Sequence, residues 1–126
     1  MGFDLRDGGL HVVLSKDVPR IIAENAAPEI EALLRRSEIT RKELEFFVLH
    51  PGGAKVLEIL EDVLELERKD TRISWDVLRE HGNQSSASVL FVLGETLARG
   101  VPSGYGLLAA FGPGITIELC LLRGRC

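Results

Sequence analysis

The chain has 126 residues, of which 45% are hydrophobic, so a single domain with a real core is expected and a disordered chain is excluded. The formal net charge of −4 gives no general attraction to nucleic acid. No apolar run is long enough to span a membrane, and the N-terminus lacks a secretory pattern. The two cysteines, Cys120 and Cys126, sit at the far end, which argues against a structural disulfide and indicates a reducing compartment such as the cytoplasm.

The first half of the chain predicts two strands around a long helix. Residues 10–14 follow a glycine pair and are β-branched or apolar, which favours a strand. Apolar residues at helical spacing predict a helix over 18–36, and Pro28 should bend it or split it in two. A continuous apolar run at 46–49 predicts a buried strand that stops at Pro51, because proline has no N–H to donate to a sheet.

His50 is the candidate functional residue at the end of that strand. Open α/β sheets bind their ligands at the carboxyl ends of strands, which is where this imidazole is expected. Gly52 and Gly53 follow, and their lack of a side chain lets other backbone come close. The alternative is a core histidine that hydrogen-bonds a backbone carbonyl. On this stretch alone the two interpretations carry equal weight.

Three helices are predicted next. The first follows Gly53 and runs to about residue 66, and the second is short, from about 75 to 80 with Ser74 as its N-cap. The third, over 85–99, is apolar nearly all round, so we expect it to be buried on every side. Asn83 lies at the entrance of this third helix, within a polar cluster.

The chain ends with two apolar segments, 105–111 and 115–122, joined by a tight Gly-Pro-Gly turn, which predicts an antiparallel hairpin. The fold class is therefore α/β. We expect a mixed sheet that includes the strand at 10–14, with helices on both faces and a C-terminal antiparallel hairpin.

Three motifs in this order resemble a known family. They are His50-Pro51-Gly52-Gly53, then Gly82-Asn83-Gln84-Ser85-Ser86-Ala87, then Phe111-Gly112-Pro113-Gly114-Ile115-Thr116. Together they resemble the C-terminal part of type III polyketide synthases, the chalcone and stilbene synthase family. Leu10-His11-Val12-Val13-Leu14-Ser15-Lys16-Asp17-Val18-Pro19 extends the resemblance to nearly the whole chain.

The resemblance implies that residues 1–126 form one thiolase-like half, with an N-terminal half absent. The family's catalytic set is Cys, His and Asn, and His50 and Asn83 match the last two. The nucleophilic cysteine belongs to the earlier half, and neither Cys120 nor Cys126 matches it, so this chain alone is expected to be inactive. The start at Met1 resembles an internal segment of bacterial members, which would fit a truncation, a split gene or a gene-model error.

The resemblance also implies the substrates. The family members are acyltransferases that take acyl-CoA and malonyl-CoA, need no metal or cofactor, and form homodimers. Phe3, Val12, Ser85 and Pro113 match positions that line the substrate cavity, although core packing explains each of them equally well. Val12 replaces a bulky gatekeeper phenylalanine of plant members, and Phe3 resembles the bulky residue of bacterial alkylpyrone and alkylresorcinol synthases.

Two other functions remain open at this point. One is a non-catalytic, thiolase-like binding or partner module that has kept the fold. The other is a relative of ketoacyl-carrier-protein synthase III, which has a similar His and Gly-Asn but normally a different pattern after the histidine.

Overall fold

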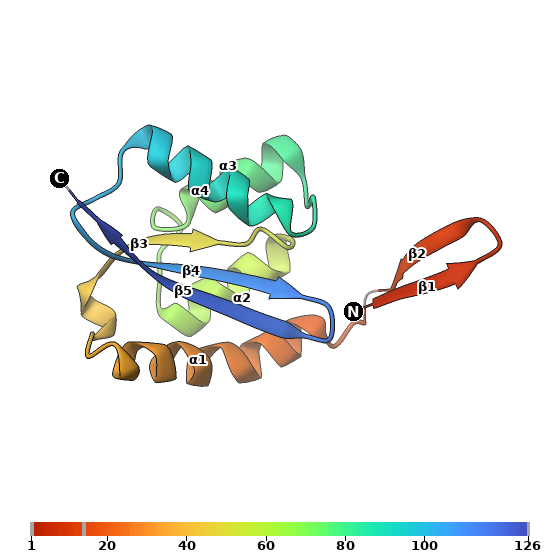
Figure 1. The fold of residues 1–126 in the computed structure, drawn as a ribbon, viewed down its shortest axis with the longest axis horizontal. Coiled ribbons are helices and arrows are strands. Elements are labelled where there is room, and N and C mark those ends of the chain that lie inside the picture. Colours follow the sequence, from red (N-terminus) through yellow and green to blue (C-terminus); the bar gives the residue numbers. More distant parts are fainter. Residues whose placement is uncertain (1, 14, 126) are drawn as a thin grey trace.

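The computed structural model describes residues 2–13 and 15–125. Figure 1 shows a body built of a sheet with helices above and below it, and a hairpin that projects from one end. In chain order the elements are β1 (Gly2–Arg6), β2 (Gly9–Val13), α1 (Val18–Arg36), the 3-10 helix η1 (Arg41–Glu43), β3 (Leu44–Leu49), α2 (Ala54–Leu64), α3 (Arg72–His81), α4 (Ala87–Arg99), β4 (Gly104–Gly112) and β5 (Thr116–Gly124).

The sheet of the body has the strand order β3-β4-β5. β3 and β4 are parallel, and the three helices between them supply the long crossover that a parallel pair requires. β4 and β5 are antiparallel and pair from Gly104↔Gly124 to Gly112↔Thr116. The mixed sheet and the C-terminal hairpin confirm the predicted fold class.

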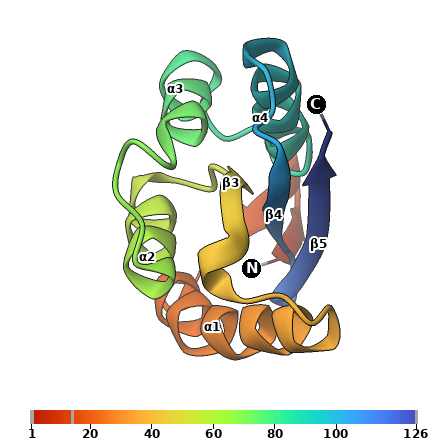
Figure 2. The ribbon, with the colours of Figure 1, turned by 90° about the vertical axis from the view of Figure 1, so that its left-hand side faces the viewer.

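The two faces of the sheet bury different pairs of helices. Side chains alternate along a strand, so neighbouring residues of β3 serve opposite sides. Leu49 packs with α1 and α2, whereas Val48 packs with α3 and α4. β4 repeats the pattern, with Leu107 on the α1–α2 side and Leu108 on the other. Figure 2 shows these two helical layers, one at each face.

Helix α4 departs from its prediction. It was expected to be buried on every side, but Leu90 is 64% exposed, Phe91 43% and Leu97 60%. Only the side with Val89 and Val92 packs on the sheet and on α3. The outer side has no covering element among the described residues, so the apolar sequence indicates a surface that something else would cover.

The N-terminal segment also differs from its prediction. The strand predicted at 10–14 does not join the sheet of the body; β2 pairs with β1 in a separate two-stranded hairpin. The prediction missed β1, although Phe3-Asp4-Leu5-Arg6 alternates apolar and charged residues and Asp7-Gly8 is a common hairpin turn. Leu14 lies outside the described residues.

Pro28 does not split its helix. α1 is a single helix from Val18 to Arg36 with Pro28 inside it. The proline removes one hydrogen bond, but Ile22, Ala26 and Ile30 remain buried on the same side of the helix, before and after it. Both halves of the helix therefore pack on the body through the same side.

Candidate functional site

The backbone around His50 is fixed by two neighbouring elements. The N–H of His50 donates to the carbonyl of Ala109 on β4 at 2.9 Å. The hydroxyl of Ser74 on α3 donates to the carbonyl of Leu49 at 2.9 Å. Ser74 is therefore not the helix cap that was predicted, because α3 begins at Arg72 and Ser74 is buried inside its first turn. It ties α3 to the strand end that carries His50.

The imidazole of His50 is only 5% exposed, and its Nδ1 is a buried atom without a hydrogen-bond partner among the described residues. Native proteins seldom leave a buried polar atom unpaired unless a function or a further molecule accounts for it. Burial lowers the pKa of His50, because the charged form loses its hydration. Burial thus favours the neutral form of the imidazole, and Nδ1 does not make the backbone hydrogen bond of a satisfied core histidine.

Asn83 lies just after α3, and its amide is oriented by two hydrogen bonds. Nδ2 donates to the carbonyl of Gly52 at 3.2 Å, and Oδ1 accepts from the backbone N–H of Ser85 at 2.9 Å. This orientation follows from the partners, since a carbonyl can only accept and a backbone N–H can only donate. The amide nitrogen has two hydrogens, so one remains for a further acceptor.

Gly52 connects the two candidate residues. Its N–H donates to the carbonyl of His50 at 2.9 Å, and its own carbonyl accepts from Asn83. A methyl group at Gly52 would lie 3.3 Å from Cδ2 of the His50 ring. His50 and Asn83 are therefore brought to the same short segment, one from a strand end and the other from a helix entrance. The sequence indicated a close approach at Gly52, but not that Asn83 would be the group approaching.

Ser85 and Pro113 lie at the same end of the sheet. Ser85 is next to the Asn83 amide and has a left-handed backbone with φ of 58°, which is uncommon for a side chain other than glycine, asparagine or aspartate. Pro113 is exposed in the β4–β5 turn, where its carbonyl accepts from the hydroxyl of Thr116 at 2.8 Å. Because β3 and β4 are parallel, this turn follows the carboxyl end of β4, on the side of the sheet where β3 ends at His50.

Phe3 and Val12 are cross-strand partners in the β1–β2 hairpin, so they belong to the same face of it. Phe3 is exposed; the side chain of Val12 lies outside the described part of the chain. The next pair on that face is Leu5↔Leu10, and both of these leucines are exposed. Figure 1 shows the hairpin leaving the body at the end toward which β3 and β4 point.

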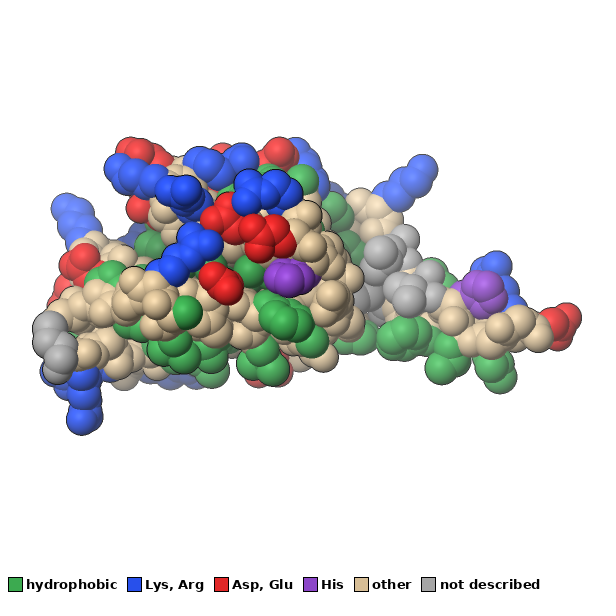
Figure 3. All heavy atoms as spheres, turned by 90° about the horizontal axis from the view of Figure 1, so that it is seen from above, with side chains coloured by type: hydrophobic (Ala, Val, Ile, Leu, Met, Phe, Trp, Pro, Cys, Tyr) green, Lys and Arg blue, Asp and Glu red, His purple; other side chains and the backbone are tan. Residues whose placement is uncertain are grey.

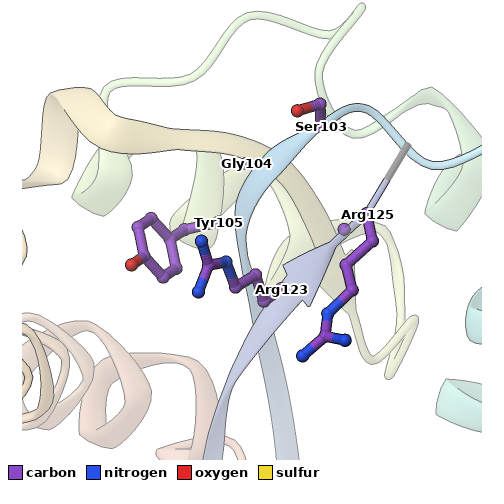
Figure 4. A pocket seen from close by; sticks show the side chains of 6 residues that line it. Ser103, Gly104, Tyr105, Arg123 and Arg125 are labelled. Atoms are coloured by element: carbon purple, nitrogen blue, oxygen red, sulfur yellow. The ribbon is translucent and has the colours of Figure 1, made fainter.

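A cavity of about 410 Å³ opens at the opposite end of the sheet, where β4 begins. Figure 4 shows its lining side chains, with the guanidinium of Arg123 lying 5.7 Å from the centre of the Tyr105 ring. The lining residues are Ser103, Gly104, Tyr105, Arg123, Gly124 and Arg125. They come from the start of β4 and the end of β5, so this cavity is separate from the His50 site.

Cys120, the cysteine within the described residues, does not stand beside His50. Cys120 is exposed on β5, and β4 separates that strand from β3, which places the two strands roughly 10 Å apart. Cys126 lies outside the described residues. Across residues 2–13 and 15–125 there is no grouping of His, Cys, Asp and Glu that could hold a metal ion. None of the helices described is long and apolar enough to cross a bilayer.

Comparison with known proteins identifies the family. Residues 1–125 match the family model for the C-terminal domain of chalcone and stilbene synthases. PKS-I from the brown alga Ectocarpus siliculosus superimposes with a TM-score of 0.88 at 34% identity, over 98% of this chain and 35% of that one. The type III polyketide synthase domain of Steely1, a type I/III hybrid from Dictyostelium, gives 0.85 at 33% identity over 97% of this chain and 35% of that one.

The fungal type III polyketide synthase ORAS gives a TM-score of 0.85 at 32% identity, over 98% of this chain and 36% of that one. The chain thus spans about a third of the length of the solved structures that it matches. The match to the family model over nearly the full chain, joined with the shared fold, leads to one conclusion. This chain belongs to the chalcone and stilbene synthase family of type III polyketide synthases, and it corresponds to their C-terminal domain.

Proposed function

We propose that this chain supplies two catalytic groups, His50 and Asn83, to a type III polyketide synthase that decarboxylates malonyl-CoA and adds the product to a cysteine-bound acyl group. The observation that carries the proposal is the junction at Gly52, against which both the His50 ring and the Asn83 amide rest. The residue types suit the chemistry, because two neutral donors can stabilise a developing oxyanion without a competing carboxylate.

The proposed reaction has two steps. In the first, the bond between the carboxylate and the α-carbon of malonyl-CoA breaks, carbon dioxide leaves, and the electron pair moves onto the thioester oxygen as an enolate. An N–H of His50 and the unpaired N–H of Asn83 donate to that oxygen, each worth roughly 3 to 4 kcal/mol. In the second, the enolate carbon attacks the acyl thioester on cysteine, and the cysteine thiolate leaves.

The nucleophilic cysteine is proposed to come from a partner portion of the enzyme. Cys120 lies exposed on β5, which β4 separates from β3, so it does not stand next to His50. His50 is buried, and its Nδ1 has no hydrogen-bond partner among the described residues, which supports a neighbouring group from the partner portion. In the complete enzyme a cysteine thiolate beside the ring would offset the burial and favour the imidazolium.

The apolar surfaces of the chain support a large missing partner. Leu90, Phe91 and Leu97 are exposed on α4, and Phe3 and Leu10 are exposed on the hairpin. Figure 3 has hydrophobic side chains along the same long side of body and hairpin, while charged groups gather above α3 and α4. The solved relatives are about three times as long as this chain, so the remaining portion of such an enzyme is the partner that we propose for this side.

The substrate assignments follow from the same proposal. Phe3 and Val12 would line the path of the acyl group from one hairpin face, and Ser85 and Pro113 would border the reacting end near Asn83. A small Val12 beside a bulky Phe3 suits a long acyl starter, as in alkylpyrone or alkylresorcinol formation. We further propose acyl-CoA and malonyl-CoA as substrates, no resident cofactor, a homodimeric complete enzyme and a cytoplasmic location.

The test combines this chain with a cysteine-bearing N-terminal portion of a type III polyketide synthase by coexpression. Radiolabelled malonyl-CoA and a fatty acyl-CoA should give polyketide products only when both portions are present. Asn83→Ala and His50→Ala should each lower turnover by about 100- to 1,000-fold. Asn25→Ala serves as a control, because Asn25 lies exposed on α1. Full turnover by the 126-residue chain alone, lost on alkylation of its cysteines, would overturn the proposal.

A further inference from the structure

We propose that Gly52 is a positioning residue that sets His50 and Asn83 relative to each other. The effect of Gly52 on catalysis rests on the proposed function. The positions of the His50 ring and the Asn83 amide can be measured on this chain directly. The backbone of Gly52 hydrogen-bonds to the carbonyl of His50 and to the amide of Asn83, and a Cβ at Gly52 would meet the His50 ring.

The imidazole of His50 lies close to the Cα of Gly52. A Cβ at Gly52 would lie 3.3 Å from Cδ2 and 3.5 Å from Nε2 of His50. The first of these distances is tighter than ordinary van der Waals contact, so the ring could keep its place only if the peptide moved by a few tenths of an ångström. The absence of a side chain at Gly52 therefore leaves the space that the His50 ring needs.

The amide of Asn83 also depends on Gly52. The carbonyl of Gly52 accepts the 3.2 Å hydrogen bond from Nδ2 of Asn83. Its N–H is also committed, at 2.9 Å, to the carbonyl of His50. The carbonyl of Gly52 thus holds one N–H of Asn83, and a Cβ on its Cα would meet the His50 ring. A shift of Gly52 would displace the His50 ring and the Asn83 amide together.

Hydrogen bonds on both sides of Gly52 hold the flanking backbone in place. The residues before Gly52 are held by Ala109 on β4 and by Ser74 on α3. On the other side, Oδ1 of Asn83 is held by the N–H of Ser85. Only Pro51 and Gly52 lie between these fixed points, so we expect a change at Gly52 to appear as a change between His50 and Asn83.

The backbone conformation of Gly52 is one that alanine can adopt, so Gly52→Ala tests the steric contact with the His50 ring. Gly53 has φ of 143° and would be strained by any side chain, whereas Gly52 does not have a positive φ. Gly52→Ala is therefore a clean perturbation of the contact. Gly94→Ala is the matched control, because a Cβ at Gly94 on α4 would meet nothing within 4 Å.

The experiment is NMR of the 126-residue chain. Long-range proton–nitrogen spectra report the His50 ring, and the side-chain amide pair of Asn83 reports its hydrogen bond. In Gly52→Ala both sets of signals should move, with the His11 and His81 ring signals unchanged. Gly94→Ala should move neither set. Movement of the His50 signals alone, or of neither set, would overturn the coupling that we propose.

A second variant covers the case in which Gly52→Ala does not fold. Asn83→Ala removes the donor to the Gly52 carbonyl and should shift the His50 ring signals through Gly52. Unchanged His50 signals in Asn83→Ala would refute the inference as directly. These readouts do not depend on turnover, so they separate this inference from the proposed function. In a two-part active enzyme, Gly52→Ala should lower kcat on the order of tenfold with KM nearly unchanged.

Discussion

The two sides of α4 should respond very differently to shortening their side chains. Val92 is fully buried between α4 and the sheet, while Leu90, two residues earlier, is 64% exposed. Val92→Ala removes two buried carbons, worth about 1.6 kcal/mol at roughly 0.8 kcal/mol each, and leaves a small cavity. We therefore expect Val92→Ala to lower the free energy of unfolding by about 2 to 3 kcal/mol.

Leu90→Ala removes three carbons, but most of their surface is already in water. Its cost should stay below about 1 kcal/mol, and the higher helix propensity of alanine offsets part of that. Urea unfolding followed by far-UV circular dichroism gives both values, at several protein concentrations. Equal losses for the two variants would refute the reasoning, because they would mean that the outer side of α4 is covered, for example by a second copy of the chain.

Three further predictions use the same unfolding assay. Burial lowers the pKa of His50 below its ordinary value of 6.5, so the unfolded chain takes up the proton first; stability should fall as the pH drops below 6.5, and His50→Gln should flatten that slope. Burial raises the pKa of Glu61, but hydrogen bonds from Thr71 and Trp75 together with Arg68 outweigh it and lower the pKa below 4.5. The stability that this carboxylate contributes is lost as the pH falls through its folded pKa. Glu61→Gln should therefore cost about 2 kcal/mol at pH 7 and flatten the fall of stability in acid, and an unchanged curve would contradict the network. Gly106→Ala would place a methyl group 2.3 Å from two ring atoms of Phe46, a steric clash that should cost about 1 to 3 kcal/mol. Gly112→Ala on the same strand would meet only Thr116, at 3.8 Å, so similar losses for the two variants would contradict the packing.

The predictable part of the fold came from patterns that are local in sequence. The apolar run before His50, the Gly-Pro-Gly turn and the helical spacing at 18–36 each specify an element through the chemistry of adjacent residues. Errors arose where a distant contact decided. Ser74 resembles a helix cap in sequence, but its hydroxyl is used by Leu49, which lies 25 residues away in the chain.

The candidate site divides in the same way. His50 and Asn83 could be proposed from sequence, because one follows a strand and the other precedes a helix, and both stand in recognisable motifs. The Gly52 carbonyl that joins them could not, since it depends on how the loop after α3 folds back on the loop after β3. Pairing across 31 residues leaves no periodic trace in a sequence.

The sequence by itself determined the α/β class, the family and the two candidate catalytic residues, because hydrophobic period, turn residues and motif order are properties of neighbours along the chain. Only the tertiary structure decided that β1 and β2 stand apart from the sheet, that α4 has an exposed apolar side, and that the amide of Asn83 bonds to the carbonyl of Gly52 beside His50. Those features depend on which surfaces meet, and a surface is assembled from residues that the sequence keeps far apart.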